Sequence, residues 1–256
     1  MTELFTTNRE TITERRFAVA AGALGIVRGD AVLVHSDLSK FGKLASGSAT
    51  VVSALTDVLI GAVGDEGVIL MPTFNYDFCH GVPFDPKGSP SKTGAWGRRF
   101  LLRPDVGRAC HPVHSMAVRD MTCRGFTNSW DDAYGKYSPF AKLLEQKGKI
   151  VFWGVGIETC TYIHYVEQCY RVPYRYMKAF NVGRQWCTMY VRDLSLGIDA
   201  GLDKLGARLT RSGDLVTVTV GEGSISVVSA AAVFDEAVTM LDEDVYSLTK
   251  HERIAR

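Results

Sequence analysis

Several protein classes are excluded by what this sequence lacks. No apolar run comes near the ~20 residues that cross a membrane. Lysine and arginine number 29 against 28 acidic residues, so there is none of the basic excess typical of nucleic-acid-binding domains. The six cysteines form neither a CxxC pair nor a zinc-finger spacing. We therefore expect no membrane or nucleic-acid partner, no metal, and the reduced thiols of a cytoplasmic protein.

The sequence also lacks linkers, internal repeats and low-complexity segments. Its 256 residues, 46% hydrophobic and 22% charged, suffice for one sizeable core, so we predict a single domain over 1–256. A twin-arginine pair before the apolar run 17–27 is compatible with a secretory signal, but Glu10 and Glu14 place acidic charge there. We expect a first helix instead, with Thr11 and Glu14 as its capping box.

The hydrophobic pattern predicts alternating strands and helices. Short apolar runs bounded by Gly, Asp or Ser indicate buried strands, and apolar residues at helical spacing indicate helices between them. The predicted strands are 31–35, 68–71, 116–118, 150–153, 187–192, 214–220 and 224–228, and the predicted helices are 11–27, 48–62, 94–102, 138–147, 159–170 and 230–241. This order is typical of an α/β domain with a mixed, largely parallel central sheet.

The strongest chemical signal lies after strand 150–153. Thr161, His164 and Glu167 are spaced at i, i+3 and i+6 of a predicted helix, so the imidazole and the carboxylate are neighbours. A carboxylate beside a histidine fixes its tautomer and raises its basicity, as a general base requires. The alternative is a solvent-exposed His–Glu pair on an amphipathic helix. The position beyond a strand end favours the catalytic interpretation.

Other candidate sites have weaker signals. The loop after strand 31–35 precedes a helix whose N-terminus could attract phosphate, although an ordinary capped turn has the same pattern. His111 and His114 lack a third ligand for zinc. Basic charge gathers in 84–110 and in 171–187, each with a net charge of +4, which indicates either a solvated face or a site for an anionic ligand.

Six ordered segments resemble the signatures of the aminoglycoside 3-N-acetyltransferase family. They are VHSDLSKFG (34–42), MPTF (71–74), PFDP (83–86), RACHPVHS (108–115), SPFAKL (138–143) and ETCTYIHYVE (158–167). The resemblance implies a three-layer α/β/α sandwich. It also implies transfer of an acyl group from coenzyme A to a primary amine of a sugar-like acceptor, by direct attack in a ternary complex.

The resemblance also implies roles for individual residues. His164 with Glu167 would prepare the amine, and Thr161 would lie near the thioester. The expected cofactor contacts are Ser36, Asp37, Leu38, Ser39, Lys40, Phe41, Gly42, Thr73 and Ser115. Asp85 and His111, which lie in two of the matching segments, are expected acceptor contacts. Trp96, Arg98 and Tyr176 are expected acceptor contacts on other grounds, because an arginine can bind a phosphate and the aromatic rings could stack on a nucleotide base. The donor is coenzyme A or an acyl carrier protein, and the sequence leaves a homodimer open.

The acceptor is predicted from a departure from the family pattern. Family members that acetylate aminoglycosides tend to carry Gly-x-x-Pro-Glu where this chain has GAWGR at 94–98. Two basic segments would repel a polycation and suit a phosphate, so we expect a nucleotide-linked amino sugar, with an aminoglycoside antibiotic as the alternative. A non-enzymatic binding module would not need the His–Glu pair, and a hydrolase of the GxSxG type is disfavoured because that pattern is absent.

Overall fold

The central element is a seven-stranded sheet with the strand order β11-β12-β8-β3-β5-β7-β6. The computed structural model describes residues 2–126, 128–197 and 200–250. The strands are β3 (Ala31–Ser36), β5 (Val68–Pro72), β6 (Gly107–Ala109), β7 (Met116–Asp120), β8 (Lys149–Trp153), β11 (Val216–Val220) and β12 (Gly223–Ser229). β3 pairs in parallel with β8 and β5, and the outer neighbours pair antiparallel. The sheet is therefore mixed, with its parallel part at the centre.

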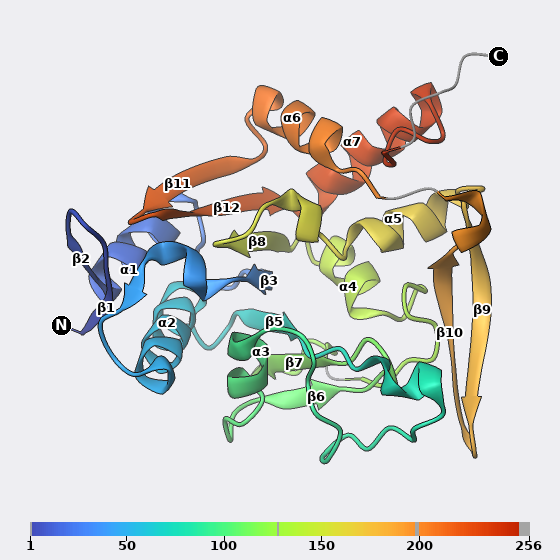
Figure 1. The fold of residues 1–256 in the computed structure, drawn as a ribbon, viewed down its shortest axis with the longest axis horizontal. Helices are drawn as coiled ribbons and strands as arrows, with labels where there is room; N and C mark the ends of the chain where they lie inside the picture. Colours follow the sequence, from blue (N-terminus) through green and yellow to red (C-terminus); the bar gives the residue numbers. More distant parts are fainter. Residues whose placement is uncertain (1, 127, 198–199, 251–256) are drawn as a thin grey trace.

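Helices cover both faces of this sheet (Figure 1). They are α1 (Glu14–Ala23), α2 (Ser48–Val63), α3 (Ala95–Phe100), α4 (Pro139–Glu145), α5 (Ile163–Tyr170), α6 (Asp203–Ser212) and α7 (Ala230–Glu243). Alternate residues of each central strand point to opposite faces. Leu33 packs in one core with α4, α5, α6 and α7, whereas Val32 packs in another with α1, α2 and α3. The predicted three-layer α/β/α sandwich is confirmed.

Smaller strands lie outside the main sheet. β1 (Glu3–Thr6), β2 (Thr11–Thr13) and β4 (Lys43–Leu44) form a three-stranded sheet. β9 (Arg175–Val182) and β10 (Gln185–Arg192) form a long hairpin beside the C-terminal end of α5 (Figure 1). Of these strands the sequence pattern predicted only β10, because the others are half exposed or too short for an apolar run to mark them. No helix among the described residues has the length and apolarity to cross a membrane.

The N-terminal ends of some helices differ from the prediction because contacts with other segments replace the expected local hydrogen bonds. Thr11 lies in β2, and Glu14 accepts a hydrogen bond from the Thr2 amide (3.3 Å), so the expected capping box does not form. Helix α2 has Gly47 as its N-cap, with no side-chain hydrogen bond at that end. Ser138 does cap α4, because its hydroxyl accepts from the Ala141 amide at 3.2 Å.

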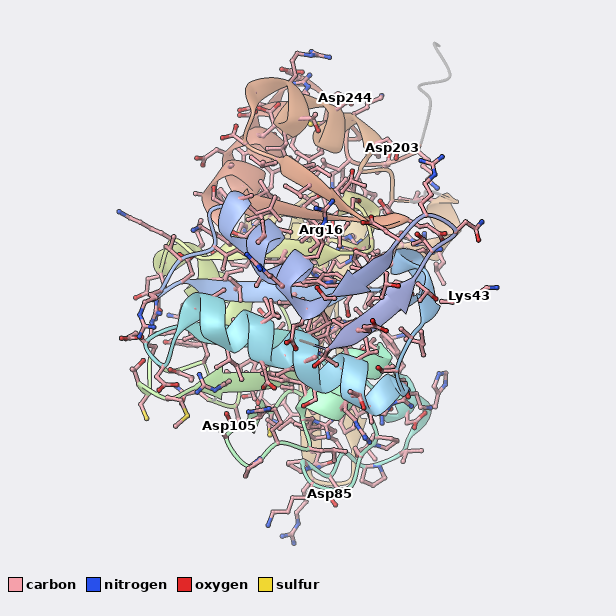
Figure 2. The ribbon with its side chains drawn as sticks, turned by 90° about the vertical axis from the view of Figure 1, so that its left-hand side faces the viewer. Arg16, Lys43, Asp85, Asp105, Asp203 and Asp244 are labelled. Atoms are coloured by element: carbon pink, nitrogen blue, oxygen red, sulfur yellow. The ribbon has the colours of Figure 1, made fainter. Side chains whose placement is uncertain are left out.

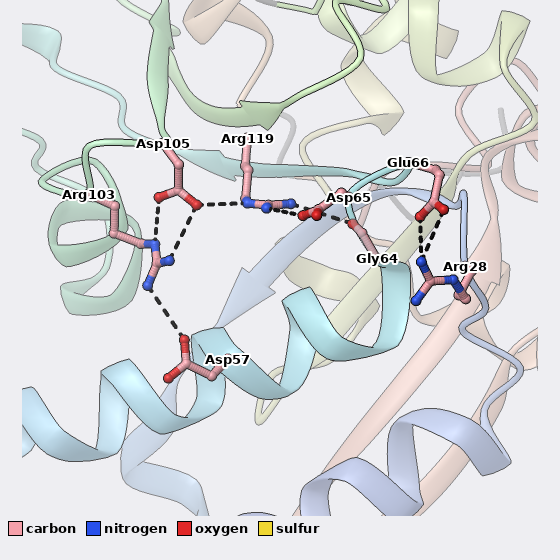
Figure 3. Close-up of polar contacts among 8 residues, drawn as sticks. All are labelled: Arg28, Asp57, Gly64, Asp65, Glu66, Arg103, Asp105 and Arg119. Atoms are coloured by element: carbon pink, nitrogen blue, oxygen red, sulfur yellow. Dashed lines mark hydrogen bonds and ion pairs between the residues drawn. The ribbon is translucent and has the colours of Figure 1, made fainter.

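An ion-pair network fixes strand β7 to the neighbouring α2 and β5 segments (Figure 3). Arg119 is 5% exposed and contacts Asp105 at 2.8 Å and Asp65 at 2.5 Å. Arg103 contacts the same Asp105 at 2.9 Å. The hydrogen bond from Arg103, supported by Arg119, lowers the pKa of Asp105 to about 2 although its partial burial opposes the shift.

Replacing Asp105 by Asn should therefore destabilise the fold in a pH-dependent way. Loss of charged hydrogen bonds to a buried guanidinium should cost ~1–3 kcal/mol at about pH 7. A carboxyl group whose pKa is lower in the folded than in the unfolded protein stabilises the fold at pH values above its unfolded-state pKa. This contribution is lost as the pH falls toward 2. Urea unfolding of both proteins should thus show a difference that shrinks from about pH 7 to about pH 3. A difference independent of pH would contradict this role for the Asp105 carboxylate.

Candidate active site

Three parallel strands end at the same edge of the sheet, where the site is built. Ser36, Pro72 and Trp153 are the last residues of β3, β5 and β8. The Asp37 amide donates to the Trp153 carbonyl at 2.9 Å, which fixes the loop after β3 beside the loop after β8. This edge is where α/β proteins place their ligands.

Helix α5 holds the predicted His–Glu pair close to this edge. His164 Nδ1 lies 2.7 Å from Glu167 Oε2. The Glu167 side chain is 2% exposed and the His164 side chain 25% exposed. The pair is therefore a buried carboxylate behind an accessible imidazole, and the alternative of a solvent-exposed ion pair is wrong.

The protonation of this pair follows from its surroundings. Burial alone would raise the pKa of Glu167, but the hydrogen bond from His164 and the charges of His164 and Arg175 outweigh it, and the pKa lies below its ordinary value. Because an ionised carboxylate only accepts, the proton between them lies on His164 Nδ1. In the neutral form of the imidazole, Nε2 has a free lone pair, as a general base requires.

An aromatic residue supports the imidazole from below. The Tyr134 ring meets His164 edge-on, with centroids 5.5 Å apart, and its hydroxyl lies 3.3 Å from His114 Nε2. Tyr134 is 3% exposed and His114 is 3% exposed, and burial lowers the pKa of His114 well below its ordinary range. Both side chains are therefore uncharged supports of His164.

A pocket of about 250 Å³ opens at the ends of β3 and β5. Ser36 and Thr161 line it together, as do Tyr76, Thr93 and Val155. An adjoining hollow of about 740 Å³, also lined by Val155, extends to the outer face of the loop after β3. The structure thus brings the predicted Thr161 and Ser36 to one cavity.

The outer hollow is polar and more acidic than basic. Asp37, Glu158 and Glu222 line it against one cation, Lys40. Further lining comes from hydroxyl groups and glycines, at Gly154, Gly156, Thr217, Thr219, Gly223, Ser224 and Ser226. Its donors toward a phosphate are therefore Lys40 and neutral groups.

Comparison with known proteins identifies the family. The pattern of the aminoglycoside 3-N-acetyltransferase family matches residues 33–242. The chain belongs to this family. It is 30% identical over 183 residues to aminoglycoside N(3)-acetyltransferase VII of Streptomyces paromomycinus, covering 63% of this chain and 62% of that protein. It is 27% identical over 217 residues to aminoglycoside N(3)-acetyltransferase VIII of Streptomyces fradiae, covering 74% of each.

Solved structures of the family share the fold. AAC-IIIb in a binary complex with CoASH superposes with a TM-score of 0.76 at 26% identity, covering 90% of this chain and 96% of that chain. The apoenzyme of the aminoglycoside acetyltransferase AAC(3)-IVa superposes equally well at 22% identity. The sequence match, by contrast, spans about 62% of the length of the first relative named above.

Several cofactor contacts implied by the family resemblance lie inside the protein. Phe41 is fully buried against Phe5 and Phe17. Thr73 and Ser115 are fully buried too, and their hydroxyls lie 3.2 Å apart. The predicted direct contact with a cofactor is wrong for these residues, because no surface of theirs is accessible.

The loop from Ser36 to Gly42 differs from the expected phosphate cradle. It contains a short 3-10 helix (Leu38–Phe41) and is followed by β4, so it does not lead directly into the N-terminus of α2. The carboxylate of Asp37 accepts from the amide of Ser39 at 3.0 Å and from its hydroxyl at 2.6 Å. Lys40 stays 61% exposed. Phosphate binding by this loop stays a prediction.

The predicted acceptor contacts separate into buried and exposed residues. Trp96 is 1% exposed and donates to Thr56 Oγ1 at 2.9 Å, so it cannot stack on a base. His111 is fully buried, and its Nδ1 accepts from the amides of Val113 and His114, which makes it a turn-forming residue. The acceptor roles predicted for Trp96 and His111 are wrong because neither side chain reaches the surface.

The other three predicted acceptor residues are exposed. Asp85 folds back on its own loop, accepting from the Lys87 amide at 3.0 Å, and lies at the lower edge of the molecule in Figure 2. Arg98 is exposed on α3, and Tyr176 is 47% exposed on β9. Contact of these residues with an acceptor stays a prediction.

Several residues of the two basic segments are already engaged within the fold. Arg175 pairs with Glu167 at 2.8 Å, Lys92 pairs with Asp77, and Arg103 with Asp57 and Asp105. Arg108 turns inward, donating to the carbonyls of Ser89 and Thr73. Asp57, Asp77 and Glu167 lie outside the two segments and neutralise part of the net charge counted for them, which weakens the inference of a phosphate-bearing acceptor.

Proposed function

We propose that this chain is a coenzyme A-dependent N-acetyltransferase whose acceptor is an aminoglycoside. The observation that carries the proposal is the buried Glu167 bound to Nδ1 of the accessible His164, whose amide donates to the carbonyl of Thr161, a residue that lines the pocket with Ser36. The proposal is further supported by membership of the family and by relatives that are named as aminoglycoside acetyltransferases.

The residues present fit an acyl-coenzyme A donor. The inner pocket, with the hydroxyls of Ser36 and Thr161, suits the acyl end, and the outer hollow leads from it to solvent. When bound, the donor supplies a thioester carbonyl that is reactive enough for direct attack by an amine. The chain then needs no nucleophile of its own, and positioning is its main contribution.

Proton transfer falls to the His–Glu pair. An alkylammonium cannot attack a carbonyl, so the amine must lose a proton, and His164 Nε2 can accept it while Glu167 stabilises the imidazolium that results. As the C–N bond forms and the C–S bond breaks, the same atom can return this proton to the departing sulfur, and the second proton that the nitrogen loses on forming the amide goes to solvent. The Thr161 hydroxyl lines the pocket as a donor for the negative charge that develops on the carbonyl oxygen.

We prefer an aminoglycoside to a nucleotide-linked sugar as the acceptor because of the charges that the fold brings together and the relatives that the chain matches. Acids from other segments neutralise several of the basic residues that suggested a phosphate site. The basic residues thus give no preference for a phosphate-bearing acceptor, and the relatives that are named as aminoglycoside acetyltransferases favour an aminoglycoside.

A thiol-release assay with acetyl-coenzyme A tests this proposal. The purified protein should release free thiol with one or more aminoglycosides and not with nucleotide-linked amino sugars, and mass spectrometry should show one acetyl group on an aminoglycoside amine. A His164→Asn protein measured in parallel gives the background rate. Turnover of nucleotide-linked sugars with no activity on any aminoglycoside would overturn the choice of acceptor.

A further inference from the structure

Two basic side chains approach the same oxygen of Glu167. His164 Nδ1 lies 2.7 Å from Oε2, and Arg175 Nε lies 2.8 Å from the same atom. The Arg175 side chain is 9% exposed. It comes from β9, the hairpin strand that lies beside the end of α5 in Figure 1, and its Nη1 donates to the Tyr190 carbonyl of β10 at 3.2 Å. The hairpin thus presents a fixed cation to the carboxylate.

The phenols and the second histidine around Glu167 are uncharged. Burial raises the pKa of Tyr134, Tyr174 and Tyr190, so these phenols stay protonated. Burial lowers the pKa of His114, which faces His164 from behind Tyr134, well below its ordinary range. Arg171 is an exposed cation at the end of α5, and its charge slightly opposes the rise that burial causes in the pKa of Tyr190. Among these described groups, Arg175 is the permanent cation in contact with Glu167.

A buried carboxylate with one histidine as its partner would have a strong tendency to bind a proton. Its charge would be poorly solvated, so the pair would take up a proton either on the imidazole or on the carboxylate. In both forms the base is lost: a protonated imidazole has no free lone pair, and a protonated carboxyl no longer stabilises an imidazolium. A second, permanent positive charge removes this tendency because it already compensates the carboxylate.

We propose that Arg175 is a positioning residue that keeps Glu167 ionised beside a neutral His164, so that the base is available at neutral pH. This inference rests on the proposed function for its link to turnover. Its electrostatic content concerns the His–Glu pair alone and can be measured without any acceptor. The role is distinct from the acceptor-phosphate contact that the basic segment 171–187 first suggested.

Three variants separate charge from packing. Arg175→Met removes the cation and keeps most of the bulk, whereas Arg175→Lys keeps a charge near Glu167. Arg119→Met is the matched control, because Arg119 is also a buried arginine paired with carboxylates, Asp65 and Asp105, on strand β7 away from α5. Thermal unfolding of each protein first shows that it is folded.

The acid limb of the kcat/KM profile is the kinetic measurement. In Arg175→Met it should move to higher pH by about 1–3 units, the usual effect of one opposite charge in direct contact. It should stay close to the wild-type position in Arg175→Lys and in Arg119→Met. If Arg175→Met lowers activity equally at all pH values, Arg175 is only a packing residue and the inference is wrong.

A histidine NMR titration gives a measurement that does not depend on the acceptor. The His164 signal, assigned by its absence in His164→Asn, should show the pair taking up its proton at a higher pH in Arg175→Met than in the wild type or Arg119→Met. An unchanged midpoint would overturn the inference even if acetyl transfer is confirmed. A shifted midpoint in a protein that acetylates no aminoglycoside would support the inference and reject the proposed function.

Discussion

Replacing His164 by Asn should lower kcat for acetyl transfer by ~10²–10⁴-fold, the range that general acid–base catalysis contributes. Asparagine retains a hydrogen-bonding group near Glu167 but cannot accept a proton from the amine at neutral pH. The side chain is 25% exposed and its Nδ1 is already bound to Glu167, so the lost function is that of Nε2. Turnover is measured by thiol release, and coenzyme A affinity by calorimetry.

The control for this prediction is His80→Asn. His80 is an exposed histidine at the end of the 3-10 helix Tyr76–His80, so its loss should leave kcat within about twofold. The affinity for coenzyme A should change little in either variant, because the base acts on the acceptor. A His164→Asn enzyme with near-normal turnover would mean that another group deprotonates the amine, and the assignment of His164 would fail.

The sequence was sufficient for features that depend on local spacing. The separation of three residues between His164 and Glu167 predicted their contact, because residues at i and i+3 of a helix are neighbours. The apolar strands Ala31–Ser36 and Lys149–Trp153 could be recognised because strands buried on both faces read as continuous hydrophobic runs.

Features that depend on distant partners could not be predicted in this way. Arg175 was grouped with a basic segment that contains no acid, and its partner Glu167 comes from the preceding helix. Trp96 and His111 were taken as surface residues, but their depth is set by the packing of α3 on α2 and by the turn after β6. Tyr134 gave no signal at all, because an aromatic residue in a loop has no characteristic spacing relative to His164.

The second large effect is expected at Gly154, which follows β8 at the site. Its φ is +77°, and a Cβ there would lie 2.2 Å from the Asp37 carbonyl oxygen and 2.9 Å from a ring atom of Phe41. Both atoms belong to the loop from Ser36 to Gly42, whose place is fixed by the Asp37–Trp153 hydrogen bond. Gly154→Ala must therefore displace this loop. A misplacement of about 1 Å can cost about 10²-fold in rate, so kcat/KM for acetyl-coenzyme A should fall by that order.

Gly213→Ala separates this displacement from ordinary backbone strain. Gly213 has a similar φ of +85° at the end of α6, but nothing lies within 4 Å of the Cβ it would gain. Both variants bear the ~1–2 kcal/mol cost of a left-handed alanine, and only Gly154→Ala also collides with the loop. Urea unfolding should show that cost in both, whereas coenzyme A affinity should fall in Gly154→Ala alone. Wild-type affinity in a folded Gly154→Ala protein would mean that the donor does not depend on the loop from Ser36 to Gly42, and its predicted role in phosphate binding would be wrong.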